Sequence, residues 1–250
     1  MPQILIRRVI PYAAALLGAA ALPSLAVAGS GGTGFGAGSS GAQSGQPTVQ
    51  SGNITVSASA NGMTISTNAS GILRRGLSVT GALPSRDAGK TVEVEISGSK
   101  TRWTWQTVAS GQVQSNGTFS AVWQTNHIGR FAIRAVTGSA GGATASAGAP
   151  TVTVIVYRPS RATLYGPGFY GRRTACGTRL RRNTIGLANR TLPCGTLVAL
   201  YYQGRTLTVP VIDRGPYAHG ADWDLTMATG KALGLTGTTT LDATSLPRSS

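Results

Sequence analysis

Residues 211–217 read VIDRGPY, and residues 222–226 read DWDLT. The chain has seven Asp and Glu residues against 22 Lys and Arg, and three of the seven lie in these two stretches. An apolar run leads to Asp213 at a Gly-Pro turn, and we expect Asp224 at the start of a short helix. The pattern brings two carboxylates together in a basic protein, which indicates acid chemistry or the binding of a polar ligand.

Each carboxylate also has a structural interpretation: Asp213 caps its own turn, and Asp224 caps the helix that follows. The N–H groups of a helix N-terminus favour a charged carboxylate and lower its pKa. At that position Asp224 would suit a binding or electrostatic role better than proton donation.

The first 28 residues have the pattern of an export signal. Arg7 and Arg8 precede a mostly apolar run over residues 9–22, and AVA at residues 26–28 is a small-residue cleavage site. A membrane anchor is the alternative, but Pro11 and Pro23 interrupt or end the run. We therefore expect a protein secreted or kept in the cell envelope, in the periplasm or cell wall, without a membrane anchor after signal cleavage.

The two cysteines, Cys176 and Cys194, would meet an oxidising compartment after export and are expected to form a disulfide. A catalytic thiol is the alternative, and only His127 and His219 are present to serve as its base. The two histidines are isolated, so the sequence predicts no metal site, and the linker glycines predict no phosphate loop and no cofactor.

The formal net charge is +15. The sequence has no helix-turn-helix and no zinc spacing, and so it predicts no nucleic acid partner. Anionic wall polymers suit a basic exported protein better, and a solvated surface that only aids solubility is the other interpretation.

Composition divides the chain. Residues 29–50 are rich in Gly and Ser and are predicted to be a flexible linker. Residues 51–157 show short alternating runs separated by turn signals, which is typical of an immunoglobulin-like β-sandwich. Such a domain can bind a protein partner. The expected strands cover residues 53–57, 77–80, 91–96, 103–105, 118–123, 131–134 and 152–156. Trp103, Trp105 and Trp123 are candidates for stacking on sugars, although core packing is the commoner fate of such side chains.

A short hinge is expected at residues 158–160, followed by a small β-barrel that completes a second domain, 158–250. Its expected strands cover residues 162–165, 184–188, 197–202, 207–212 and 238–243. One helix is expected over residues 227–233, with Thr226 as N-cap and Gly234 as C-cap.

This segment resembles the rare lipoprotein A (RlpA) family. The motifs that carry the resemblance are LYGPGFYGRRTA at 164–175, RTLP at 190–193 with GT at 195–196, VIDRGPY at 211–217, and DLT at 224–226 with ALG at 232–234. The resemblance implies a six-stranded double-psi β-barrel with one short helix, as in expansins and a membrane-bound lytic transglycosylase. Active members are lytic transglycosylases that cleave the bond between N-acetylmuramic acid and N-acetylglucosamine. One carboxyl group protonates the leaving oxygen, and a hydroxyl group of the sugar attacks.

The chain departs from the family pattern at three positions. Thr178, Arg181 and Asn189 stand where the family often has Glu, Asp and His. Thr and Arg cannot donate and recover a proton as a carboxylic acid does. Asp213 and Asp224 do match, and in expansin-like barrels the equivalent pair lies in the polysaccharide groove.

The resemblance thus assigns the catalytic role to Asp213 and Asp224. Thr163 and Tyr165 alternate onto one face of the first barrel strand and would meet them. The remaining candidates for the substrate groove are Arg214, Tyr217, His219 and Trp223. Three functions stay open: a lytic transglycosylase acting on peptidoglycan, a non-catalytic expansin-like module that binds or loosens a wall glycan, and an adhesion or interaction protein.

Overall fold

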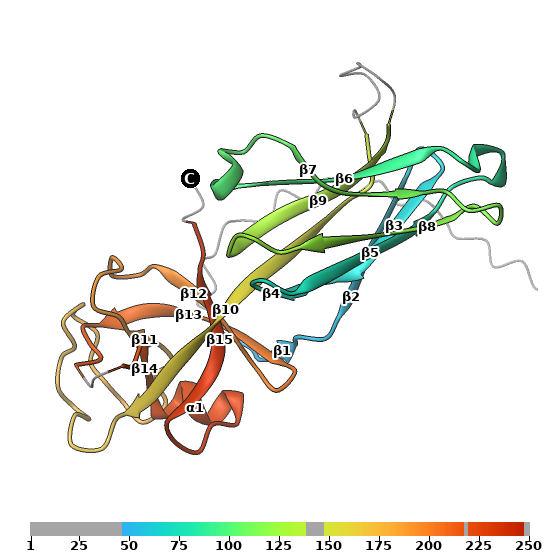
Figure 1. The fold of residues 1–250 in the computed structure, drawn as a ribbon. Coiled ribbons are helices and arrows are strands. Elements are labelled where there is room, and N and C mark those ends of the chain that lie inside the picture. The colour runs from blue at the N-terminus through green and yellow to red at the C-terminus, as the bar shows by residue number, and fades with distance from the viewer. Residues whose placement is uncertain (1–46, 139–147, 218–219, 248–250) are drawn as a thin grey trace, which may run out of the picture. The chain divides into compact units, whose positions relative to one another are not determined.

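The computed structural model describes residues 47–138, 148–217 and 220–247, which form mainly β-strands (Figure 1). These residues contain one α-helix, α1 (Met227–Leu233), and two short 3₁₀ helices, η1 (Ser85–Asp87) and η2 (Ser99–Thr101). No helix among them is both long and apolar enough to cross a membrane. The predicted signal at 1–28 and residues 29–46 of the predicted linker lie outside the described residues. The mainly β class is confirmed.

The strands between residues 55 and 156 form two sheets. The first is antiparallel, in the order β2 (Thr55–Ala60), β3 (Met63–Asn68), β5 (Gly76–Ala82) and β8 (Thr118–Gln124). The second has the order β7 (Gln106–Gln112), β6 (Thr91–Gly98), β9 (Gly129–Thr137) and the first part of β10 (Thr151–Tyr165), to which β4 (Ser70–Ile72) also pairs.

Alternating apolar residues make these sheets pack on one another. In β8 every second residue is buried, and the buried ones are Phe119, Ala121 and Trp123. They join residues of the second sheet in one core, where the ring of Trp123 meets Phe131 edge to face with 5.5 Å between centroids. Trp123 is therefore a core residue and does not stack on sugars. The immunoglobulin type of residues 51–157 stays a prediction.

The strand expected at residues 103–105 is wrong. This segment is a turn between η2 and β7. Arg102 and Trp103 both have positive φ angles, 54° and 62°, which no strand accommodates. The hydroxyl group of Thr101 closes the turn, because it donates to the carbonyl of Thr104 at 2.8 Å. Trp103 is 66% exposed as a result.

β10 continues through the hinge expected at residues 158–160. Its first part pairs with β9, and Arg158 already pairs with β15. Pro159 lies within the strand even though it has no N–H group to donate. Pairing with β9 ends at Val156, pairing with β4 ends at Tyr157, and pairing with β14 begins at Ala162, so residues 158–161 of the strand pair with β15 alone. A proline is tolerated where one edge of a strand needs no ladder hydrogen bond.

The second part of β10 belongs to a closed barrel of six strands in the order β10, β14, β11, β13, β12, β15 and back to β10. The other strands are β11 (Leu187–Ala188), β12 (Leu197–Tyr202), β13 (Arg205–Asp213), β14 (Trp223–Thr226) and β15 (Thr239–Ser245). The series of strand pairings closes on itself, and one apolar core fills the interior of the ring.

Helix α1 has the predicted bounds and caps. The hydroxyl oxygen of Thr226 accepts from the N–H of Thr229, and Gly234 ends the helix in the left-handed conformation. The strand expected over residues 184–188 is shorter than predicted, since only Leu187 and Ala188 pair. β14 was not predicted.

A two-residue strand, β1 (Gln50–Ser51), pairs with β13 at Thr206 and Arg205. The last residue of the predicted linker and the first of the predicted sandwich thus lie against a barrel strand. Just beyond, the N–H of Gly52 donates to the carbonyl of Gly204 at 2.8 Å.

Candidate functional site

Four residues form a row across neighbouring barrel strands. Asp224 on β14 pairs with Thr163 on β10 and with Ala188 on β11, and Ala188 pairs with Asp213 on β13. Two strand spacings place the Cα atoms of the two aspartates about 10 Å apart. The methyl side chain of Ala188 is the only one between the carboxylates in this row.

The period of the strands explains the row. Ala162, Trp223 and Leu187 each point into the barrel core. The next residue on each strand points the other way, and these residues are Thr163, Asp224 and Ala188. A register shift between Leu187 and Ala188 brings Asp213 into the same row.

Asp224 is half-buried, and its carboxylate accepts a hydrogen bond from the hydroxyl group of Thr163 at 2.7 Å. Burial raises the pKa of Asp224, and the charge of Asp213 raises it further, whereas the Thr163 hydrogen bond opposes the shift. The expected lowering by a helix N-terminus is wrong, because Asp224 lies in β14 and Thr226 caps α1. A carboxyl group held in this way keeps its proton to a higher pH and can act as an acid.

Asp213 is held by two backbone amides. Its Oδ1 accepts from the N–H of Ala175 and from the N–H of Arg214, both at 2.8 Å. The second of these bonds is the turn-capping role expected from the sequence. The first comes from a loop 38 residues earlier, and no sequence signal indicated it.

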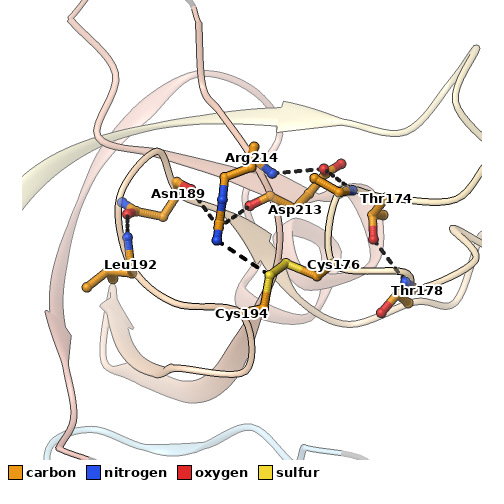
Figure 2. The surroundings of a disulfide bond; sticks show 9 residues. Thr174, Cys176, Thr178, Asn189, Leu192, Cys194, Asp213 and Arg214 are labelled. Carbon is orange, nitrogen blue, oxygen red and sulfur yellow. Dashed lines mark hydrogen bonds between the residues drawn. A yellow bond between two sulfur atoms is a disulfide. The ribbon is translucent and has the colours of Figure 1, made fainter.

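The disulfide predicted between Cys176 and Cys194 is present, with 5.7 Å between the Cα atoms. Figure 2 shows it beside the Asp213 turn. Cys176 directly follows Ala175, so the disulfide ties down the loop whose amide binds Asp213. Arg214 contacts the same structure, since its Nη2 lies 3.5 Å from Cys194 Sγ. Its Nη1 donates to the carbonyl of Asn189 at 3.3 Å.

Tyr165 follows Thr163 by two residues on β10 and therefore faces the same side. Its hydroxyl oxygen is buried and has no hydrogen-bond partner within the described residues. Burial raises the pKa of Tyr165, and the charges of Asp213 and Asp224 add to the rise. Its ring packs against Phe169, which is 52% exposed and which sequence reasoning had not singled out.

The other predicted groove residues divide into three groups. Arg214 is half-buried beside the disulfide, and Tyr217 is 80% exposed at the end of the Gly-Pro turn. Trp223 was expected in the groove, but it is 5% exposed and belongs to the barrel core, because it alternates with Asp224 along β14. His219 lies outside the described residues.

Three positions depart from the family pattern: Asn189 and Thr178 make hydrogen bonds within loops, and Arg181 points into solvent. The side chain of Asn189 accepts from the N–H groups of Thr191 and Leu192 and donates to the carbonyl of Asp222. The N–H of Thr178 donates to the hydroxyl group of Thr174, and Arg181 is exposed. Within the described residues, no group of three or more His, Cys, Asp or Glu side chains is placed to hold a metal ion.

The sequence of this barrel is similar to those of known proteins. A family model described as lytic transglycolase matches residues 160–244. A protein of Synechocystis sp. called probable endolytic peptidoglycan transglycosylase RlpA is 43% identical over 76 residues, which are 30% of this chain and 24% of that protein. One of Aquifex aeolicus with the same name is 43% identical over 76 residues, 30% of this chain and 34% of its own length.

A protein of Campylobacter jejuni called endolytic peptidoglycan transglycosylase RlpA is 38% identical over 66 residues, 26% of this chain and 24% of that protein. The chain thus spans about a quarter to a third of these relatives. The matched range and the six-stranded closed ring coincide. Residues 160–244 form a C-terminal RlpA-like double-psi β-barrel domain.

Proposed function

We propose that the barrel is a lytic transglycosylase that cleaves the bond between N-acetylmuramic acid and N-acetylglucosamine in peptidoglycan. The observation that carries the proposal is the row of Asp224 and Asp213, in which burial raises the pKa of Asp224. An enzyme of this kind needs a carboxyl group that stays protonated until it meets the glycosidic oxygen. The names of the relatives support peptidoglycan as the substrate.

In the proposed reaction Asp224 donates its proton to the glycosidic oxygen, and the bond from that oxygen to the sugar carbon C1 breaks. A hydroxyl group of the same sugar attacks C1, forms the anhydro ring and loses its proton to a carboxylate. Asp213 lies across Ala188 from Asp224 and is held by two backbone amides, so it can stabilise the positive charge that develops at C1.

Substrate contacts are proposed for the residues around this row. Thr163 orients Asp224 through its hydrogen bond. Tyr165, whose hydroxyl group is buried and has no partner within the described residues, stays a candidate from the sequence. Tyr217 and Arg214 lie at the turn after Asp213, where the exposed ring of Tyr217 can stack on a sugar face. His219 stays a candidate from the sequence.

A second function is favoured by a specific observation. Thr178 and Arg181 have no carboxyl group where the family often has one, and the side chain of Asn189 is used in loop contacts. This arrangement also fits a non-catalytic, expansin-like module that binds or loosens a wall glycan through Asp213 and Asp224.

Digestion of purified peptidoglycan sacculi separates the two functions. We expect the full chain to release anhydro-muropeptides, detected by mass spectrometry, and Asp224→Asn to release none. Asp242→Asn is a matched control, since Asp242 lies on β15 of the same barrel and burial also raises its pKa. The lytic proposal fails if the unaltered protein cosediments with sacculi but releases no anhydro product.

We also propose the setting of the enzyme. Residues 1–28 would be a cleaved export signal, and residues 51–157 an immunoglobulin-like domain available to a protein partner, with the barrel domain over 158–250. An envelope location is consistent with relatives named for acting on peptidoglycan. Cell fractionation tests this: recovery of the full-length, unprocessed chain in the cytoplasm would contradict it.

A further inference from the structure

A loop of the barrel between β10 and β11 concentrates positive charge. Five arginines lie within eleven residues of it: Arg172, Arg173, Arg179, Arg181 and Arg182. All five are exposed, and the sequence has no acidic residue between Glu95 and Asp213. We call residues 171–182 the arginine loop.

Nothing in the described part of the chain neutralises these charges. The ion pairs found there join Lys90 to Asp87, Arg134 to Glu95 and Arg158 to Asp222, and none includes an arginine of the loop.

Arg173 and Arg179 lie directly opposite each other in an isolated antiparallel β-bridge. Like charges placed in this way destabilise a fold, and a local rule broken without internal compensation is typical of functional positions.

The backbone of the loop is fixed. Three hydrogen bonds, each from a backbone N–H group to a backbone carbonyl, join its two arms at 2.8 to 2.9 Å. They run from Gly171 to Leu180, from Leu180 to Arg172 and from Thr174 to Thr178. Leu180 is 2% exposed and anchors one arm of the loop. The disulfide of Cys176 anchors its tip. The arginines are therefore displayed from a pre-organised surface, which lowers the entropic cost of binding a ligand.

The tip of the loop reaches the proposed active site. The N–H of Ala175 donates to Asp213 Oδ1 at 2.8 Å, and the disulfide joins Cys176 to the loop that carries Cys194 (Figure 2). A polymer bound at Asp213 would therefore lie beside the tip of the arginine loop. Two of its guanidinium groups are already oriented, since Arg173 and Arg179 each donate to a backbone carbonyl of the loop.

We propose that the arginine loop binds the anionic groups, carboxylate or phosphate, that a wall glycan carries beside the bond held at Asp213 and Asp224. The inference rests on the proposed function and narrows its substrate to an acidic glycan. Guanidinium groups suit both ligands, because they form paired hydrogen bonds with carboxylate and with phosphate.

Binding is tested with the full chain and three soluble probes that share one backbone: carboxymethyl dextran, phosphorylated dextran and unmodified dextran. The loop variant is Arg172→Gln with Arg181→Gln, whose side chains make no hydrogen bond or ion pair within the described residues. The matched control, Arg74→Gln with Arg75→Gln, removes the same charge from an exposed turn outside the barrel.

We expect the loop variant to bind one or both charged dextrans about tenfold more weakly, and the control to change by less than about twofold. The charged dextran that binds more tightly identifies carboxylate or phosphate as the ligand. Added salt should weaken binding of the unaltered protein. Equal losses in the loop variant and the control, or no loss in either, would overturn the proposal, and so would tighter binding to a DNA duplex than to both charged dextrans.

Sacculus digestion links the loop to the reaction. If both proposals hold, the loop variant should raise KM for sacculi and leave kcat unchanged. Loop-dependent binding of charged dextran by a protein that releases no anhydro product would reject the transglycosylase and keep the loop as an anion-binding surface. Product release with an unchanged KM in the loop variant would reject the role of the loop.

Discussion

The proposed proton donor of the candidate site is one half-buried carboxyl group, that of Asp224. Its pKa is raised in the folded protein, so its contribution to stability is present at pH below the unfolded value of 3.8 and is lost as pH rises through the folded value. We therefore expect Asp224→Asn to raise the melting temperature at pH 7 and to change it little at pH 3. Asp87→Asn should behave in the opposite way. A hydrogen bond from Lys90 lowers the pKa of Asp87, so this variant should not raise the melting temperature at pH 7. A lower melting temperature for Asp224→Asn at pH 7 would contradict the burial argument.

The hydroxyl group of Thr163 sets how far that pKa rises. It donates to Asp224 Oδ1 at 2.7 Å and stabilises the charged form. In Thr163→Val this bond is lost and the pKa of Asp224 rises further. The activity of an enzyme that uses protonated Asp224 should then persist to higher pH, which the alkaline limb of a pH–rate profile on sacculi measures. Thr163→Ser keeps the donor and should keep the profile, whereas equal profiles for the Val variant and the unaltered protein would exclude this role.

The sequence predicted correctly which way a side chain faces wherever the strand itself had been recognised, because side chains alternate along a strand. Alternation along residues 162–165 places Thr163 and Tyr165 on the side of the aspartates, as predicted. It failed for Trp223, because β14 was not recognised as a strand. Once β14 is a strand, Trp223 and Asp224 must point to opposite sides. Ala188 could not be identified, since its role as a small spacer depends on the order of strands in the ring.

At the scale of elements, the disulfide loop positions Asp213. Closing a loop between residues 18 apart restricts the unfolded chain, and replacing both cysteines by alanine should cost about 3 kcal/mol of unfolding free energy. The loop that holds Ala175 against Asp213 would also be released. Urea unfolding of Cys176→Ala with Cys194→Ala measures the first effect, and kcat on sacculi measures the second. A variant that loses stability but keeps kcat would show that the disulfide acts on folding alone.

Elements encoded by local chemistry were predicted well, and elements set by distant contacts were not. The bounds of α1 follow from the Thr226 cap and from Gly234, both of which act on their own backbone. The turn at residues 103–105 depends on positive φ angles that a run of aromatic residues does not indicate. β11, with two residues, and β14, with four, are strands only because longer strands flank them in the ring.

At the scale of the whole molecule, β10 connects the two parts of the described chain. It pairs with β9 of one sheet and with β14 and β15 of the barrel. The sequence predicted a hinge at residues 158–160, and a proline such as Pro159 usually interrupts a strand. Pairing with neighbours far along the chain overrides that preference, and sequence alone does not reveal it.

Tyr157, in the middle of β10, shows what this continuity does for stability. Its side chain is 2% exposed and packs with Ala199 and Leu246 of the barrel, and its ring lies 5.8 Å from that of Tyr201. Removing a buried aromatic ring costs about 3 to 5 kcal/mol, so Tyr157→Ala should lower the unfolding free energy by about that amount. Tyr217→Ala is the matched control, since Tyr217 is 80% exposed and should change stability little. If Tyr157 couples the sheets to the barrel, calorimetry should show one transition for the unaltered chain and two for Tyr157→Ala. Two transitions in the unaltered chain would mean that β10 connects two independently stable units, each unfolding without the other.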